Sequence, residues 1–91
     1  MKRTFDEDGW RDYIHWVEND RQLLAKVNAL IEDSARSPFR GIGKPEPLKG
    51  ELSGWWSRRI DDEHRMIYRV TGKGEAQTLE IIQLRFHYRR R

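Results

Sequence analysis

The chain ends in LRFHYRRR, which sets the imidazole of His87 and the phenol of Tyr88 side by side, directly before three arginines at residues 89–91. Histidine is the side chain whose protonation ordinarily changes near neutral pH, so His87 could donate a proton to a leaving group. The plainer interpretation is a structural or merely exposed histidine, followed by a frayed basic terminus with nonspecific affinity for polyanions. This stretch therefore suggests proton transfer beside a polyanion without establishing it.

A carboxylate in the stretch RGIGKPEPLKG is the second candidate. Glu46 stands between two prolines and is flanked by Lys44 and Lys49. Because the prolines keep it out of a helix interior or a central strand, Glu46 is a candidate general base or organiser of a phosphate site. An ordinary solvated loop is the alternative.

Four arginines occur in segments that are otherwise mostly aromatic or aliphatic: Arg58, Arg59, Arg65 and Arg69. Guanidinium groups donate paired hydrogen bonds to oxyanions, so these residues suit a phosphate clamp. The alternative is a solvated sheet face, balanced by the acidic residues 61–63. The positive charge of this half of the chain favours the clamp.

The composition argues against metal sites, cofactors and membrane spans. The 91 residues include no cysteine and only three histidines, which stand far apart, so we expect no metal site and no cofactor. No apolar run approaches the roughly 18 residues of a membrane span, and the first residues form no apolar signal core. We expect a cytoplasmic protein with one small domain over residues 1–91 and no membrane contact.

Charge is distributed unevenly along the chain. Residues 1–33 carry five Lys/Arg and eight Asp/Glu, whereas residues 34–91 carry thirteen and seven, within a formal net charge of +3. A polyanion should therefore meet the second half of the chain.

The first half predicts a short strand and a helical hairpin. Residues 2–5 form the strand, and the acidic residues 6–8 suit the first turn of a helix. The predicted apolar face of that helix consists of Trp10, Tyr13, Ile14 and Val17. Asp20 is the expected N-cap of a second helix, which should stop at Ser37-Pro38. Its predicted buried stripe consists of Leu23, Leu24, Val27, Leu30 and Ile31.

After a predicted loop at residues 39–50 the hydrophobic period changes to two. The alternation predicts strands over residues 55–60, 65–70 and 79–88, with turns at 61–63 and 72–74. Successive strand residues point to opposite faces, so Arg85 should share a face with His87, and Phe86 with Tyr88, unless the last strand bends. We expect an α+β fold in the order β-α-α-β-β-β, with an antiparallel sheet.

Three motifs in this order resemble one family closely. KPEPLK, LSGWWSRRI and EHRMIY, followed by the terminal His-Tyr, are similar to the YoeB-type toxins of the RelE superfamily. The resemblance extends over nearly the whole chain. The three terminal arginines and a longer final hairpin at residues 72–75 depart from it and leave target preference open. It implies a small RelE-like domain, with an N-terminal strand, a helical hairpin and then an antiparallel sheet.

The activity implied by the resemblance is ribosome-dependent cleavage of messenger RNA in the A site, through attack of a ribose 2′-hydroxyl on the adjoining phosphate. By matching position, Glu46 is the general base, Arg65 stabilises the phosphate charge and His87 is the general acid. The positions implied to bind or orient the RNA are Lys44, Lys49, Arg59 and Tyr88. A glutamate beside lysines is a weak base at neutral pH, so the free protein should cut naked RNA poorly.

The resemblance also implies partners. The first is a YefM-like antitoxin, whose acidic segment would cover or rearrange Tyr88 and His87. The others are the small ribosomal subunit with its message, and a second copy of the chain in a homodimer. DNA would be bound only through the antitoxin, since the chain shows no recognition-helix pattern. The alternatives are a catalytically silent RNA- or ribosome-binding module and an antitoxin-dependent operator-binding corepressor.

Overall fold

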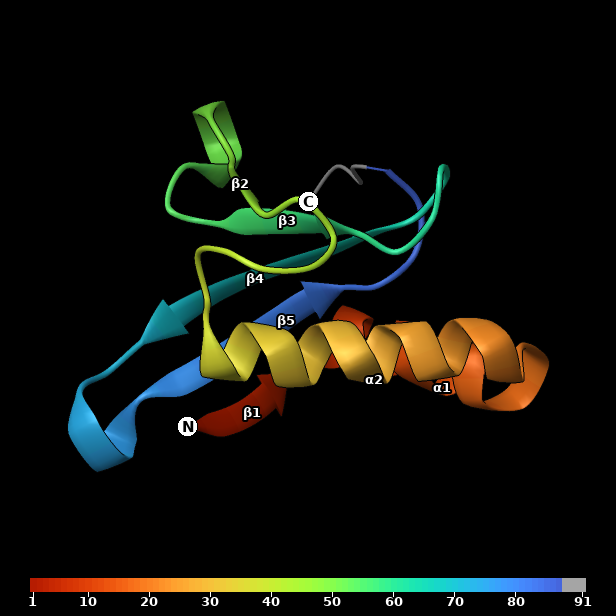
Figure 1. Cartoon of the computed structure of the whole chain (residues 1–91), viewed down its shortest axis with the longest axis horizontal. Coiled ribbons are helices and arrows are strands. Elements are labelled where there is room, and N and C mark those ends of the chain that lie inside the picture. Colours follow the sequence, from red (N-terminus) through yellow and green to blue (C-terminus); the bar gives the residue numbers. More distant parts are fainter. Residues whose placement is uncertain (88–91) are drawn as a thin grey trace.

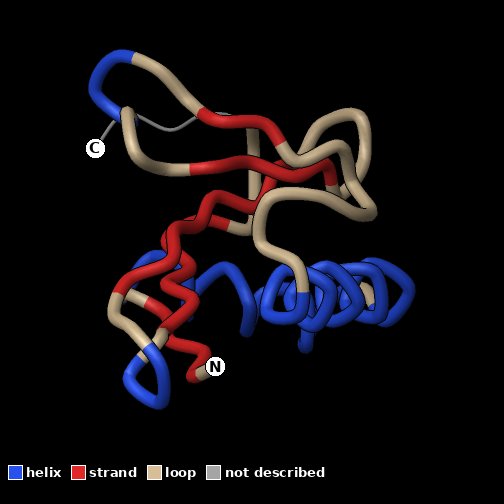
Figure 2. Tube along the Cα trace, turned by 60° about the vertical axis from the view of Figure 1, so that its left-hand side comes forward, coloured by secondary structure: helices blue, strands red, loops and turns tan. Residues whose placement is uncertain are grey.

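Two long helices and a five-stranded sheet make up the protein, for which a computed structural model describes residues 1–87 (Figure 1). The elements are β1 (Lys2–Phe5), α1 (Glu7–Asn19), α2 (Arg21–Arg36), β2 (Glu46–Pro47), β3 (Trp56–Arg59), β4 (Arg65–Thr71) and β5 (Thr78–Gln83), with 3₁₀ turns at Gly50–Leu52 and Gly74–Ala76. The predicted α+β fold is therefore confirmed. Figure 2 shows the strands twisting away from the helix pair, so that β2 and β3 lie at the end of the sheet away from β1.

The sheet is mixed, not wholly antiparallel as the sequence predicted. Its strand order is β1-β5-β4-β3-β2, in which β1 runs parallel to β5 and the other neighbours are antiparallel. The crossover that a parallel pair requires is the whole chain between β1 and β5, which includes the helical hairpin. Residues 46 and 47, predicted as loop, form the edge strand β2, a position that tolerates proline because one side of the strand needs no hydrogen-bonding partner.

The ends of both helices follow the local signals of the sequence. Asp20 caps α2 as predicted, with its side chain accepting a hydrogen bond of 3.0 Å from the Leu23 N–H. The helix ends at Arg36, directly before the predicted stop at Ser37-Pro38. Asp6 caps α1 in the same way through the Gly9 N–H. No helix in the described part of the chain is both long and apolar enough to cross a membrane.

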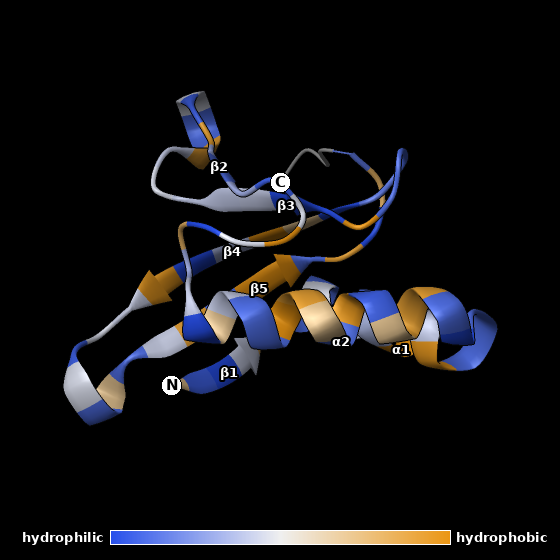
Figure 3. Cartoon of the chain, viewed as in Figure 1, coloured by the Kyte–Doolittle hydropathy of each residue, from blue (hydrophilic) through white to orange (hydrophobic). Residues whose placement is uncertain are grey.

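The core lies between the helices and the sheet, where Figure 3 shows hydrophobic residues on β4, β5 and one side of α2. Val27, Leu30 and Ile31 are buried, which confirms the centre of the predicted stripe of α2. Leu23 and Leu24 are half-buried against the same core.

The predicted apolar face of α1 is half-buried at Tyr13 and Ile14, but the buried side of the helix is rotated away from it. Trp10 and Val17 are exposed, whereas Asp12 and Trp16 are buried. The reason is a pair of hydrogen bonds to Leu84, the first residue after β5: Asp12 Oδ2 accepts from its N–H at 3.0 Å, and Trp16 Nε1 donates to its carbonyl oxygen at 2.8 Å. Apolar spacing alone does not reveal a helix face that is buried through a carboxylate.

The last predicted strand is shorter than expected. β5 ends at Gln83, and residues 85–87 form a bend that includes Phe86 at φ 64°. The alternation predicted for Arg85 and His87 on one face and Phe86 on the other therefore does not hold. Tyr88 lies outside the described residues. The turn predicted at residues 72–74 is confirmed between β4 and β5.

Candidate active site

A polar cavity of about 200 Å³ collects most of the residues singled out in the sequence. It is lined by Lys44, Glu46, Ser57, Arg59, Arg65 and His87. These residues come from the end of the loop after α2, from three strands and from the segment after β5. Side chains up to 43 positions apart in the chain thus face one space that holds three cations, a carboxylate and an imidazole.

Strand register explains how the sheet gathers them. Glu46 on β2 pairs with Ser57 on β3, and Arg59 on β3 pairs with Arg65 on β4. Ser57 and Arg59 are two residues apart and so share a sheet face, and directly paired residues share it too. Four lining residues therefore stand in two adjacent cross-strand pairs.

Ser57 was missed by the sequence analysis. It is buried, and it lines the cavity between Glu46 and Arg59. The signal that could have found it is its position two residues before Arg59 on the same strand, which places its hydroxyl on the face that carries the candidate residues.

Arg65 is held rigidly at the cavity. Its side chain is buried, and Nη1 donates to the backbone oxygens of Asp61 at 2.7 Å, of His64 at 3.0 Å and of Asp62 at 3.4 Å. Nε and Nη2 make no hydrogen bond to any residue in the range 1–87. One nitrogen thus anchors the guanidinium, and the remaining N–H groups can serve an oxyanion.

Two backbone positions beside the cavity are strained. Among the described non-glycine residues, Lys44 at φ 51° and Phe86 at φ 64° adopt positive φ angles. Lys44 lines the cavity, and Phe86 directly precedes His87. The left-handed region disfavours residues with a Cβ by about 1–2 kcal/mol. Such strain is typical of functional sites, where the surrounding structure fixes it.

Replacing Lys44 with glycine is therefore expected to stabilise the fold. Relief of about 1–2 kcal/mol of strain, offset by about 0.5–1 kcal/mol of backbone entropy, leaves a net gain of about 0.5–1 kcal/mol in the free energy of unfolding. Urea denaturation measures it. Lys44→Ala is the matched control, since it removes the same exposed side chain but keeps the strained Cβ. Equal stability of the glycine and alanine variants would contradict the strain argument.

Arg58 is neither a phosphate ligand nor part of a solvated face, which corrects both predicted roles. Its side chain is fully buried, and Nη1 lies 2.6 Å from Asp33 Oδ2. The same guanidinium donates to the Tyr68 hydroxyl and to three loop carbonyls, those of Ser37, Arg40 and Ile42. Arg58 thus fixes the loop that leads from α2 to Lys44 and Glu46.

Two partners of Arg58, Asp33 and Tyr68, have shifted pKa values, for different reasons. The hydrogen bond from Arg58 is the main reason that the pKa of Asp33 is lowered, and the Ile42 N–H adds a second hydrogen bond to the same carboxylate. Burial raises the pKa of Tyr68, whose hydroxyl donates to the Pro38 carbonyl at 2.6 Å. The loop is therefore held by charge and by hydrogen bonds at several points.

Two further predicted residues, Lys49 and Arg69, do not line the cavity. Lys49 is exposed just before the Gly50–Leu52 turn and does not line the cavity. Arg69, a member of the predicted clamp, pairs with Glu80 at 2.5 Å and lies over the ring of Trp55. Tyr88 is outside the described residues. Within residues 1–87 no group of three His, Cys, Asp or Glu side chains could hold a metal ion.

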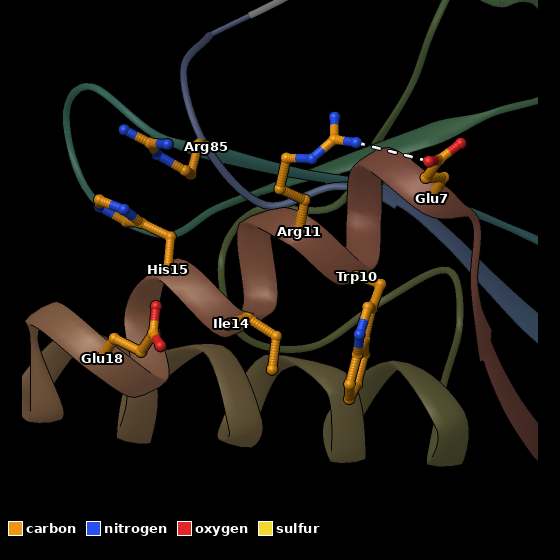
Figure 4. Close-up of a pocket in the computed structure, with 7 residues that line it drawn as sticks. All are labelled: Glu7, Trp10, Arg11, Ile14, His15, Glu18 and Arg85. Atoms are coloured by element: carbon orange, nitrogen blue, oxygen red, sulfur yellow. Dashed lines mark hydrogen bonds and ion pairs between the residues drawn. The ribbon is translucent and has the colours of Figure 1, made fainter.

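A second cavity, of about 520 Å³, lies on the outer side of α1 (Figure 4). It is lined by Glu7, Trp10, Arg11, Ile14, His15, Glu18 and Arg85, and shares no residue with the first cavity. In Figure 4, Arg11 points toward Glu7, with which it forms a 3.5 Å ion pair. This cavity also contains carboxylates, cations and an imidazole, but Glu46, Arg65 and His87 do not line it.

Comparisons with known proteins point to one family. The family described as a YoeB-like toxin of bacterial type II toxin-antitoxin system matches residues 5–88. Toxin YoeB of Streptomyces coelicolor is 56% identical over 88 residues, which cover 97% of this chain and 100% of the relative.

Solved structures give the same result. A YoeB/ParE toxin from Agrobacterium tumefaciens superposes with a TM-score of 0.93 at 52% identity, covering 97% of this chain and 100% of that one. YoeB of Staphylococcus aureus was solved as a dimer and in a complex with YefM, and both structures give a TM-score of 0.85, at 36% and 35% identity. Each match covers 97% of this chain and 98% of the S. aureus chain. The resemblance of the three motifs is thereby confirmed: the chain belongs to the YoeB-like toxins of bacterial type II toxin-antitoxin systems.

Proposed function

We propose that this toxin is a metal-independent endoribonuclease, which cuts messenger RNA in the ribosomal A site and so stops translation. The observation that carries the proposal is the convergence of Glu46, Arg65 and His87 on one cavity. They supply a carboxylate, a guanidinium with uncommitted N–H groups, and an imidazole, all within a basic surrounding that suits a polyanion.

The reaction that suits these groups is transesterification within the RNA. Glu46 takes the proton of a ribose 2′-hydroxyl, and the 2′ oxygen attacks the adjoining phosphorus. The bond from phosphorus to the 5′ oxygen breaks, and His87 donates its proton to that oxygen. Arg65 stabilises the negative charge that builds on the phosphoryl oxygens. The products are a 2′,3′-cyclic phosphate and a 5′-hydroxyl.

Dependence on the ribosome follows from the exposure of the two proton-transfer groups. Glu46 lies on an edge strand and His87 on a bend, and both are exposed. Alignment of the message in the A site would supply the orientation that the open cavity lacks, and orientation alone can contribute several powers of ten in rate.

The proposed partners follow from the S. aureus relative, which was solved with YefM and as a dimer. We expect this chain to bind a YefM-like antitoxin in the cytoplasm, through an acidic segment that complements the basic cavity. We also expect a homodimer, because the S. aureus relative was solved as a dimer.

Primer extension on a defined message in a reconstituted translation system tests the function. We expect one cut inside the A-site codon, which requires ribosomes and is absent or far weaker on naked RNA. The antitoxin should suppress it. Binding to ribosomes without any cut would favour the silent binding module instead.

A further inference from the structure

The segment that carries His87 has left the sheet, yet it is held by side chains from several elements. Leu84 is buried, and its peptide N–H and carbonyl are both bound by α1, through Asp12 and Trp16. These hydrogen bonds replace the ladder bonds that Leu84 would have made as a strand residue. The position of the following bend is therefore set by helix α1.

Phe86 is the next fixed point. Its N–H donates to Nδ1 of His64 at 2.7 Å, and its carbonyl oxygen accepts from the Arg65 N–H at 2.9 Å. Residues 64 and 65 thus bind both polar backbone groups of the one residue in this bend that has a left-handed conformation. A strained residue persists only where its neighbours hold it.

Gln83 completes the attachment. It is fully buried at the end of β5, and its Nε2 donates to the Phe86 oxygen at 3.2 Å and to the His87 oxygen at 3.1 Å. One amide group therefore joins the last strand to the backbone of His87 itself. Neither Gln83 nor His64 lines the cavity, so their contact with the site passes through this backbone.

The hydrogen bond from Phe86 defines the state of His64. An imidazole nitrogen can accept from an N–H only while it carries no proton, so this hydrogen bond requires the tautomer of His64 that has its proton on Nε2. The ring is 8% exposed and lies edge-on to Trp16, with a centroid distance of 4.9 Å.

We propose that His64 and Gln83 are positioning residues that hold the bend of residues 85–87 so that His87 faces the cavity, and that His64 does so only as a neutral imidazole. The effect on RNA cleavage rests on the proposed function, but the effect on the bend does not. Protonation of Nδ1 would turn an acceptor into a donor, and Phe86 would lose its partner. The bend should therefore loosen as the pH falls.

The charges around His64 do not reverse the expected loosening of the bend at low pH. The charged or titratable groups nearest in the chain to His64 and to its ring contacts are Asp61, Asp62, Glu63 and Arg65 around His64, Arg85 and His87 beside Phe86, and Asp12 and His15 near Trp16. Glu63 Oε1 lies 3.6 Å from Nε2 and favours the imidazolium, but its side chain is 73% exposed, so solvent screens the pair.

Hydrogen exchange of the Phe86 amide in the full chain tests the proposal directly. At about pH 7 this amide should be protected. His64→Phe and Gln83→Met should each reduce the protection by about tenfold, as expected for the loss of one hydrogen bond. His64→Asn is the matched control, because its side-chain oxygen can replace Nδ1 as an acceptor and cannot be protonated there; it should keep the protection.

A pH titration of the unmodified protein by NMR keeps the test independent of any variant that fails to fold. The Phe86 amide signal should shift together with the His64 ring signals, whereas in His64→Asn that transition should be absent. Unchanged exchange of Phe86 in both His64→Phe and Gln83→Met, or a Phe86 signal that ignores the titration of His64, would overturn the proposal.

Kinetics on ribosomes connect the bend to cleavage. We expect Gln83→Met and His64→Phe to lower kcat by about 10- to 100-fold with little change in KM, since a small displacement of a catalytic group can cost about 100-fold in rate. His64→Asn should retain the rate of cleavage. It should also lose that part of the fall in rate at acid pH that comes from protonation of His64. If the unmodified protein cuts no RNA, the proposed function fails, and the exchange and titration results still decide whether His64 and Gln83 hold the bend.

Discussion

Replacing Glu46 with glutamine is expected to reduce cleavage of ribosome-bound message by about 100- to 10,000-fold, the usual contribution of a general base. The change keeps the size of the side chain and removes only its ability to accept a proton. Because Glu46 is exposed on an edge strand, the fold should be unaffected. His87→Gln should have a similar effect through loss of the general acid. Single-turnover primer extension measures both rates.

Matched controls separate chemistry from general charge or ribosome binding. Glu51→Gln alters a nearby exposed carboxylate, and His15→Gln alters a histidine on α1; neither residue lines the candidate cavity. Both should cut at nearly the normal rate. The Glu46→Gln, His87→Gln double variant should be about as inactive as either single variant, because groups that act in one step are not additive. Full activity in either single variant would remove that residue from the mechanism.

The sequence predicted the cavity residues better than it predicted their surroundings. Glu46, Arg65 and His87 were assigned together only through the resemblance, since nothing in the spacing of residues 46, 65 and 87 brings them near one another. Strand register supplies the missing link, because it pairs Arg59 with Arg65 and Glu46 with Ser57. The two-residue alternation along each strand could therefore have identified which residues share a face, but not which strands would be neighbours.

Arg58 shows where alternation is insufficient. Its position correctly separates it from Arg59, which lies on the opposite face. A strand pattern does not reveal that an acidic side chain and three loop carbonyls converge on that face, so a buried guanidinium was predicted as a surface cation. The same applies to Asp12, whose burial depends on the peptide group of Leu84, 72 positions away in the sequence.

The end of β5 could not be predicted for a related reason. The run from Leu79 onward alternates as a strand should, but strand pairing with β4 reaches only to Gln83. Beyond it, contacts from His64 and Gln83 determine the backbone, and a left-handed phenylalanine is contrary to local preference. Local sequence rules fail there because tertiary hydrogen bonds overcome them.

Replacing Asp33 with asparagine is expected to lower the free energy of unfolding by about 2–3 kcal/mol. Removing one partner of a buried ion pair typically costs about 3–5 kcal/mol, because the other charge is left buried without compensation. The lower figure applies because the loop carbonyls still accept from Arg58, and an asparagine oxygen can accept one hydrogen bond. Cleavage should fall as well, since the loosened loop leads to Lys44 and Glu46. Urea denaturation at about pH 7 measures the stability.

The pH dependence distinguishes this ion pair from simple packing. Arg58 lowers the pKa of Asp33 in the folded protein, so the carboxylate stabilises the fold above its unfolded pKa, and that contribution disappears as the pH falls through the folded pKa. The difference in stability between the unmodified protein and Asp33→Asn should therefore shrink from about pH 7 to about pH 3. Asp62→Asn, in the exposed turn before β4, should change stability by less than about 0.5 kcal/mol at either pH. A difference for Asp33→Asn that stays constant with pH would show that packing, and not the charge of Asp33, holds the loop over Arg58.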